Sequence, residues 1–309
     1  MEHEQPYTSL AAALGALSGT AVHVAHTERI FGGDINISYK LELTNGQTFF
    51  MKTNAMENCA FFAAESAGLS ALRSCGVIGV VRPRAYGIDA DGYGIDAGRR
   101  AGYSFLLLDY IASGRKCNDY WVRFGHELAA LHRAPCTQFV RGGLFGFVQD
   151  NYIGATRQIN TPADSWIAFF RDCRLRPQLE RAAPYFDASF RKKCAVLLEK
   201  LDAVLSEPQM PSLVHGDLWS GNVIAGDNGY ACLIDPAIYV GHAEADIAMT
   251  ELFGGFPRAF YDAYNDVNLL EAGYAQRRDV YNLYHLLNHV NLFGRSYVAA
   301  VYDVVNAYV

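Results

Sequence analysis

A histidine, an aspartate and an asparagine stand close together in residues 213–222, which read LVHGDLWSGN. His215, Asp217 and Asn222 fit the pattern H-x-D-x-x-x-x-N, in which the aspartate accepts or orients the proton of an attacking hydroxyl during phosphoryl transfer. The asparagine offers a neutral oxygen ligand to Mg²⁺. The spacing therefore predicts that Asp217 is a catalytic base and that Asn222 binds a metal ion from the same loop.

A second carboxylate follows in the segment LIDP, where Asp235 lies 18 residues after Asp217. Two short strands, expected at 222–225 and 230–235 and joined by the turn GDNG, would bring it back to the loop. Kinases place a metal-binding carboxylate at this position, and Asp-Pro is the form seen in small-molecule kinases. Because Mg²⁺ takes oxygen ligands, Asn222 and Asp235 together predict a magnesium site.

The residues that would hold a nucleotide stand upstream. Lys52 ends a strand-like run, and Glu65 follows 13 residues later in a helical pattern. A lysine that is paired to a helix glutamate and contacts the phosphates of ATP is the kinase arrangement. Gly32 and Gly33 would let backbone amides approach the phosphates. Taken singly, such a lysine is often only a solvated charge and two glycines only a turn, but their combined order and spacing predict an ATP site.

The elements that must position these residues change character near residue 110. Apolar alternation and turn signals predict strands at 21–31, 36–43, 47–53, 81–88 and 103–111, with a helix at 57–74 after the third strand. A short helix is expected at 6–17, with Pro6 near its start. Helical periodicity then dominates at 119–133, 164–182, 187–206, 243–253, 257–265, 276–293 and 295–308. The pattern predicts an α+β bilobal protein with a β-rich lobe at 1–108, a hinge at 109–115 and a helical lobe at 116–309.

Composition excludes several other classes of protein. The 309 residues are 51% hydrophobic and 19% charged, with a net charge of −6 and no run of Lys and Arg that would suit nucleic acid. The seven cysteines are scattered without a C-x-x-C pair, as expected for reduced thiols. Glu2 and Glu4 argue against a secretion signal, and no apolar stretch reaches the roughly 18 residues of a membrane span. We expect a cytoplasmic monomer.

The sequence around the motifs resembles the bacterial-type fructosamine/ketosamine kinases. The likeness runs from about residue 7 to residue 295 and includes LVHGDLWSGNV, LIDPAIYVGHAEADIAMTELFGGF, and the segments 145–160 and 164–175. Aminoglycoside and choline kinases share the H-G-D-x-x-x-x-N and D-P elements, but not the Trp-Ser-Gly filling or the FGGF block at 253–256. The resemblance implies a protein-kinase-like fold. It also implies ATP-dependent phosphorylation of the 3-hydroxyl of ribulosamine, erythrulosamine or fructosamine adducts of amines or lysine, leading to deglycation.

The resemblance also assigns roles within the nucleotide site. It implies that Asp217 is the base, that Asn222 and Asp235 hold Mg²⁺, and that Lys52 and Glu65 position the phosphates. The backbone of a hinge would bind adenine, and this hinge would comprise Asp109, Tyr110 and Ile111. Asp246 would brace the catalytic loop from the following helix.

The acceptor would meet a second group of residues. An aromatic face at Trp219 suits the C–H face of a sugar and attracts a cationic amine, although the same residue could instead pack as core. His215 and Glu244 are further candidates for the substrate site, with Glu244 or Asp217 expected to pair with the amine.

Two other functions stay open at this stage. The chain could be a kinase of another small molecule, such as an aminoglycoside, choline or a free sugar, and its net acidity would suit a cationic acceptor. It could also be a non-catalytic nucleotide-binding scaffold, which the presence of the base, the metal ligands and the lysine disfavours. The preferred ketosamine, and whether it is free or protein-bound, are left open by the sequence.

Overall fold

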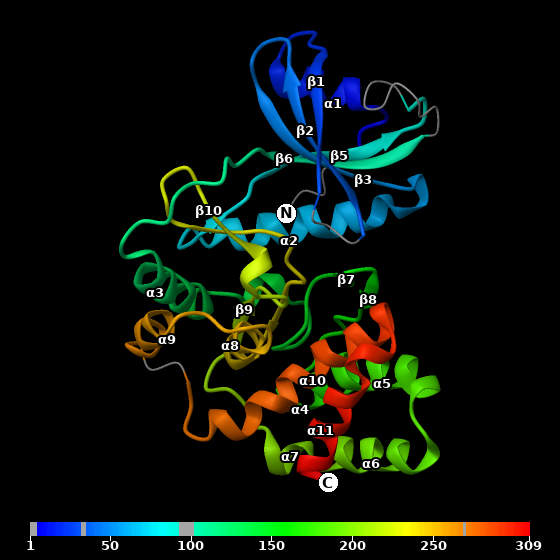
Figure 1. Ribbon diagram of the computed structural model, residues 1–309, viewed down its shortest axis with the longest axis vertical. Coiled ribbons are helices and arrows are strands. Elements are labelled where there is room, and N and C mark those ends of the chain that lie inside the picture. Colours follow the sequence, from blue (N-terminus) through cyan, green and yellow to red (C-terminus); the bar gives the residue numbers. More distant parts are fainter. Residues whose placement is uncertain (1–4, 32–34, 93–101, 268–269) are drawn as a thin grey trace.

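The computed structural model describes residues 5–31, 35–92, 102–267 and 270–309. Two lobes are stacked along the long axis, with a twisted sheet and one long helix above a mainly helical body (Figure 1). The expected α+β bilobal architecture is confirmed. Within the described ranges, no helix is both long enough and apolar enough to cross a lipid bilayer.

The N-terminal lobe is built on a five-stranded antiparallel sheet with the order β1-β2-β3-β6-β5. Side chains of β6 alternate between two cores, as the period of a strand requires. Phe105 and Leu107 pack with α1, whereas Leu106 and Leu108 pack in the main core with α2. The elements of this lobe are α1 (Leu10–Ser18), β1 (Val24–Ile30), β2 (Ile37–Leu43), β3 (Thr48–Asn54), α2 (Cys59–Ser74), β4 (Gly79–Val80), β5 (Pro83–Asp89) and β6 (Tyr103–Asp109).

The first helix begins later than the sequence suggested. It starts at Leu10 because the hydroxyl of Ser9 accepts a hydrogen bond from the amide of Ala12, which makes Ser9 the N-cap. Tyr7 lies outside the helix and forms a bridge to Gly87 at the edge of the sheet. The expectation that Pro6 opens the helix was therefore wrong, since a side-chain cap outweighs the mild preference of proline for a first turn.

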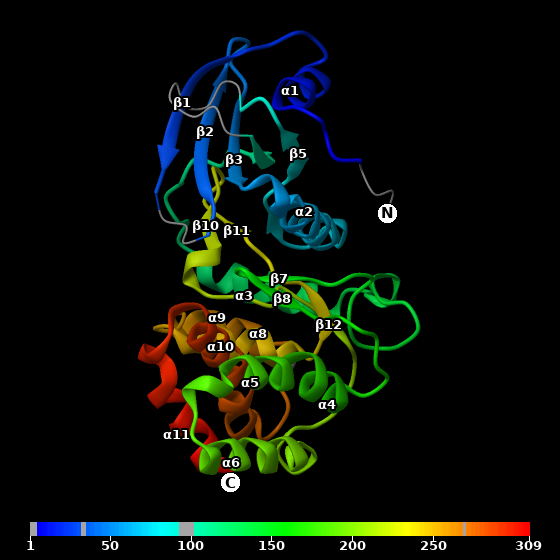
Figure 2. The same cartoon turned by 90° about the vertical axis from the view of Figure 1, so that its right-hand side faces the viewer.

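The C-terminal lobe is assembled around the long helix α10, which packs against α5, α8 and α11 (Figure 2). Its helices are α3 (Tyr120–Arg133), α4 (Trp166–Phe169), α5 (Arg176–Ala182), α6 (Ala188–Glu199), α7 (Leu201–Val204), α8 (Ala243–Leu252), α9 (Arg258–Asn265), α10 (Tyr274–Phe293) and α11 (Val298–Tyr308). Its short strands are β7 (Asn151–Ile153), β8 (Thr156–Gln158), β9 (Ser212–Val214), β10 (Val223–Ala225), β11 (Ala231–Leu233) and β12 (Tyr239–Gly241).

Two of the expected long helices are interrupted. The segment expected as one helix at 164–182 contains a π-helical stretch, Phe170–Leu175, between α4 and α5. The segment expected at 187–206 divides at Lys200 into α6 and α7. Both interruptions keep apolar residues on the buried side, so the spacing of apolar residues does not reveal them.

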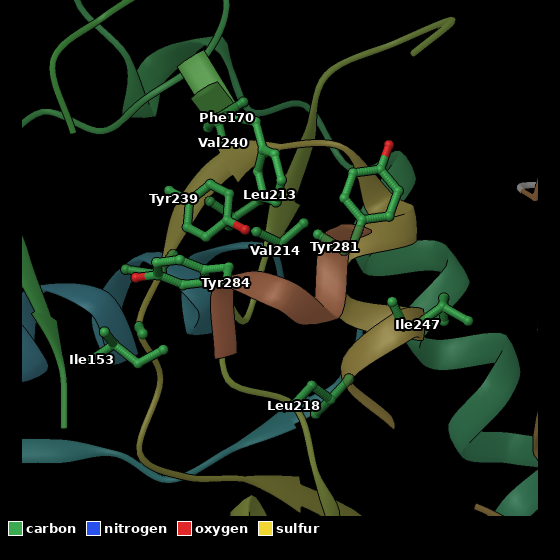
Figure 3. Packing of buried hydrophobic residues seen from close by; sticks show 14 of the residues in the cluster. Ile153, Phe170, Leu213, Val214, Leu218, Tyr239, Val240, Ile247, Tyr281 and Tyr284 are labelled. Atoms are coloured by element: carbon green, nitrogen blue, oxygen red, sulfur yellow. The ribbon is translucent and has the colours of Figure 1, made fainter. Parts of the chain in front are cut away.

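The strand that leads into the catalytic loop is anchored in the main core. Leu213 and Val214 of β9 are fully buried and pair with β12, at Val240 and Tyr239. Figure 3 shows these side chains gathered with tyrosines of α10. The loop therefore leaves a rigid platform.

Candidate active site

The catalytic loop follows β9 and is held by one buried carboxylate. Asp246, on α8, accepts hydrogen bonds from the backbone amides of His215 at 2.7 Å and Gly216 at 2.8 Å. His132 of α3 lies 3.2 Å from the same carboxylate. Gly216 has a φ of 80°, and a Cβ there would collide with the carbonyl of Ala237. The loop can adopt this path because the residue is glycine.

Asp217 and Asn222 are brought together as their spacing predicted. The amide Nδ2 of Asn222 donates to the carbonyl oxygen of Asp217 at 2.7 Å and to its Oδ2 at 3.0 Å. Because Nδ2 is used in this way, the Oδ1 of Asn222 is the atom left for a ligand. Burial raises the pKa of Asp217 to about 7, and the charges of Asp235 and Asp246 add to the rise.

Lys52 joins the two lobes at the site. Its Nζ lies 2.7 Å from Oε1 of Glu65 on α2 and 2.5 Å from Oδ1 of Asp235. Burial by itself lowers the pKa of Lys52, but the charges of Asp235 and Glu65 outweigh it and raise the pKa. The lysine therefore stays cationic, as a group that contacts phosphates must.

Asp235 stands in an unusual backbone conformation. Its φ of 54° makes it, among the described residues, the non-glycine residue with a positive φ. Such a conformation costs about 1 kcal/mol or more and must be held by its surroundings. Ile234 provides that support, because its amide donates to the carbonyl of Asn222 at 3.0 Å and its carbonyl lies 2.9 Å from Nε2 of His215. These bonds tie Asp235 to the catalytic loop.

The oxygen donors at this place fit Mg²⁺. Asn222 offers a carbonyl oxygen and Asp235 a carboxylate whose side chain is 43% exposed. Within the described ranges there is no cluster of three or more His, Cys, Asp or Glu residues that could hold a metal ion by themselves. Mg²⁺ commonly takes one or two protein oxygens and completes its shell with phosphates and water, so two donors suffice.

The expected hinge follows the last strand of the sheet. β6 ends at Asp109, whose amide donates to the carbonyl of Arg82 at 3.0 Å and whose side chain lies 3.5 Å from Arg84. Tyr110 lies beneath Lys40, and Ile111 packs against the main core. The backbone amide of Asp109 therefore already has a hydrogen-bond partner within the protein and is not free to bind adenine. Gly32 and Gly33 lie outside the described residues.

The candidates for the acceptor site divide sharply. Trp219 is 37% exposed, so the alternative that it packs in the core is excluded. Its ring meets that of Phe253 edge-on, with the two ring centres 6.2 Å apart. His215 is fully buried and Glu244 is inaccessible, its carboxylate held by Arg277 at 2.6 and 2.7 Å. Internal hydrogen bonds use both side chains, so the structure gives no support to the predicted contact of His215 and Glu244 with the substrate.

Two residues at the site were missed by the sequence reasoning. His132 supports Asp246 from α3, and Phe253, in the FGGF block, contacts Trp219. A single histidine on an apolar helix face carries no spacing signal. Phe253 could have been found, because it lies in a block that had already been singled out beside the catalytic motifs.

Comparison with known proteins gives concordant matches. The family model described as fructosamine kinase matches residues 6–309. A probable ketoamine kinase of Synechocystis sp. is 40% identical over 299 residues, covering 94% of this chain and 93% of that protein. A chloroplastic protein-ribulosamine 3-kinase of Arabidopsis thaliana is 36% identical over 292 residues, covering 94% of this chain and 84% of that protein.

Solved structures agree with the sequence matches. A Thermobifida fusca protein assigned as a fructosamine-3-kinase has a TM-score of 0.79 and 31% identity, covering 98% of this chain and 99% of that chain. A macrolide 2′-phosphotransferase of Brachybacterium faecium, 14% identical, and a choline kinase of Streptococcus pneumoniae, 13% identical, both have TM-scores of 0.56 and show the shared fold alone.

Proposed function

The chain belongs to the fructosamine kinase family, and we propose that it transfers the γ-phosphoryl group of ATP to the 3-hydroxyl of ketosamines. The observation that carries this proposal is one loop that holds Asp217, Asn222 and the exposed Trp219 together, facing Lys52 of the other lobe through Asp235. Asp217 supplies a base, Asn222 a metal ligand and Trp219 a surface for a sugar. Lys52 supplies a cation for the phosphates.

In the proposed mechanism, catalysis is positioning and electrostatics. Lys52 holds the phosphates of ATP and is itself fixed by Glu65. Asp217 accepts the proton of the attacking hydroxyl as the oxygen approaches the γ-phosphorus in line with the leaving ADP. Asn222 and Asp235 would hold Mg²⁺, which supplies charge neutralisation of the triphosphate when bound.

Trp219 is proposed to receive the sugar. Its exposed ring follows Asp217 by two residues, and Phe253 supports it from the side. An aromatic face stacks on the C–H face of a sugar and attracts the cationic amine of a ketosamine. The resulting 3-phosphate is unstable and releases the sugar from the amine, so the outcome is deglycation.

Other acceptors are less well supported. Aminoglycosides and choline would suit an acidic protein, but the macrolide phosphotransferase and the choline kinase that share the fold resemble the chain only at the level of fold. The relatives that align over nearly the whole chain carry ketoamine or ribulosamine kinase names. A scaffold without activity is disfavoured because the base, the lysine and both metal ligands are present and in contact.

An acceptor panel tests the proposal. ATP consumption is measured with ribulosamine, erythrulosamine, psicosamine and fructosamine derivatives of lysine, and with an aminoglycoside and choline as contrasts. We expect turnover with at least one ketosamine and none with the contrasts. Asp217→Asn, the matched control, should bind Mg-ATP normally and lose about 10²-fold or more in turnover. Turnover with the contrasts alone, or undiminished activity of Asp217→Asn, would contradict the proposal.

A further inference from the structure

A buried nitrogen beside the catalytic aspartate lacks a hydrogen-bond partner. His285 lies on α10 and is 4% exposed, and its Nδ1 has no partner among the described residues. This nitrogen lies 3.9 Å from Oδ1 of Asp217, which is too far for a hydrogen bond. The other oxygen of that carboxylate already accepts from Asn222. A buried polar atom of this kind is unfavourable unless a ligand or water pairs with it.

The spacing of these two atoms suits one bridging hydroxyl oxygen. An oxygen placed about 2.8 Å from each of two atoms that are 3.9 Å apart would see them at an angle of about 90°. A hydroxyl can donate to the carboxylate and accept from the imidazole in that geometry. Burial lowers the pKa of His285 to about 3, so the ring is neutral and carries a single proton, which Nδ1 can hold.

We propose that His285 positions the 3-hydroxyl of the acceptor by donating from Nδ1–H to the hydroxyl oxygen while the hydroxyl proton points at Oδ1 of Asp217. The inference rests on the proposed function and adds a residue that determines which hydroxyl reacts. During transfer, the hydroxyl oxygen uses its second lone pair to bond to the γ-phosphorus. The bond from phosphorus to the bridging oxygen of ADP breaks, and the hydroxyl proton passes to Asp217. His285 keeps its own proton throughout.

The inference makes binding depend on one hydroxyl. An acceptor that lacks this hydroxyl leaves the buried Nδ1 unpaired, and a site built to bond a hydroxyl discriminates strongly against such an analogue. Asp217 also accepts from this hydroxyl, so the contribution of His285 is the part of the discrimination that is lost when the imidazole is removed.

The test measures binding as well as turnover. Ribulosyl-lysine, or the panel acceptor that the wild-type enzyme turns over fastest, is titrated with its 3-deoxy analogue as the comparison, in the presence of AMP-PNP and Mg²⁺. His285→Leu should weaken binding of the parent acceptor by about tenfold or more and leave the analogue within about threefold. It should lower kcat by about 10- to 100-fold with an unchanged KM for ATP. His285→Asn, which places an amide near Nδ1, should restore most of the loss.

A matched variant and the wild-type enzyme distinguish failure of the inference about His285 from failure of the proposed function. Asn282→Leu removes another buried polar side chain of α10 whose Oδ1 also lacks a partner among the described residues, and it should not alter the ratio of the two affinities. Equal weakening of parent and analogue by His285→Leu, or no rescue by asparagine, would overturn the inference while leaving ketosamine turnover intact. If the leucine variant does not fold, equal affinity of the wild-type enzyme for parent and analogue overturns it. A wild-type enzyme that phosphorylates no ketosamine refutes the proposed function itself.

Discussion

Lys52 and Asp235 form the contact that the nucleotide would reorganise. The lysine holds both Glu65 and Asp235, although Asp235 is also proposed as a metal ligand. The phosphates of ATP would compete with Asp235 for Lys52, and a metal ion would compete with Lys52 for Asp235. The buried Glu65 contact, by contrast, can remain, because Glu65 lies on the helix behind the site. The lysine is therefore held in place before ATP arrives.

The raised pKa of Asp217 predicts a pH-dependent rate. Burial raises this pKa to about 7, so below that pH the carboxyl holds a proton and cannot accept one from the hydroxyl. We expect kcat/KM for ATP to fall about tenfold per pH unit below pH 7 and to level off above it. Initial rates measured from pH 5.5 to 9 check this. A profile that stays flat down to pH 5.5 would mean that the base titrates as an ordinary aspartate.

The proximity of site residues could be predicted where spacing along the chain encodes it. Asp217 and Asn222 stand on one loop, and the hairpin that brings back Asp235 is short, so their proximity follows from local structure. The burial of Glu244 could not be predicted, because its partner, Arg277, is 33 residues away on another helix. A sequence pattern shows a charge but does not show which distant charge neutralises it.

At the scale of elements, the segments 145–160 and 164–175 form a buried polar support beneath the site. Arg174, in the π-helical stretch, donates to the carbonyl of Ile159 at 2.6 Å and to Oδ1 of Asn160 at 2.7 Å. Its guanidinium lies 4.0 Å from the centre of the Tyr239 ring. Tyr239 belongs to β12, which pairs with the strand before the catalytic loop. The cation therefore stabilises the platform from below.

The hairpin β7–β8 extends this support to the segment that follows Asp235. Gln158 donates to the carbonyl of Ala237 at 2.9 Å, and Asn151 donates to the carbonyl of Ile238 at 2.7 Å. Both carbonyls lie just after Asp235, whose strained backbone needs such restraint. The segments 145–160 and 164–175, which carried the family resemblance, therefore also stabilise the site.

Replacing Arg174 tests this support. Arg174→Met removes a fully buried cation and leaves the carbonyl of Ile159 and the side-chain Oδ1 of Asn160 without their donor. We therefore expect a loss of about 2–4 kcal/mol in the free energy of unfolding. Arg181→Met, at an exposed position on α5, is the matched control and should change it by less than about 0.5 kcal/mol. Urea unfolding measures both. Equal stability of the two variants would show that the buried arginine contributes nothing to the platform.

Long regular elements were predictable, and most of the shortest strands were not. The strands of the main sheet and most helices follow from their apolar period. Strands of two or three residues carry no such period, and β4, β7, β8 and β12 were accordingly not foreseen, whereas the turn GDNG led to β10 and β11. The π-helical stretch was also hidden, because its buried side is continuous with its flanking helices.

For the molecule as a whole, the two lobes are joined behind the site as well as at the hinge. β4 pairs with β11 of the other lobe, at Gly79 and Cys232, and the rings of Phe61 and Tyr152 lie 4.0 Å apart. Gly68 of α2 lies against Ile238, shortly after Asp235. Pairings between residues so far apart in the chain could not be foreseen, whereas the change from strand to helix periodicity did predict two lobes.

Taken together, the residues between the two lobes are proposed to phosphorylate a ketosamine at its 3-hydroxyl. Ribulosyl-lysine is incubated with Mg-ATP, the phosphate position is determined by phosphorus NMR and mass spectrometry, and free lysine is quantified over time. The account predicts a 3-phosphate that appears first and then declines as lysine and inorganic phosphate are released, with none of these in Asp217→Asn. Phosphate on another hydroxyl, or ADP formed without any phosphorylated ketosamine or released lysine, would contradict it.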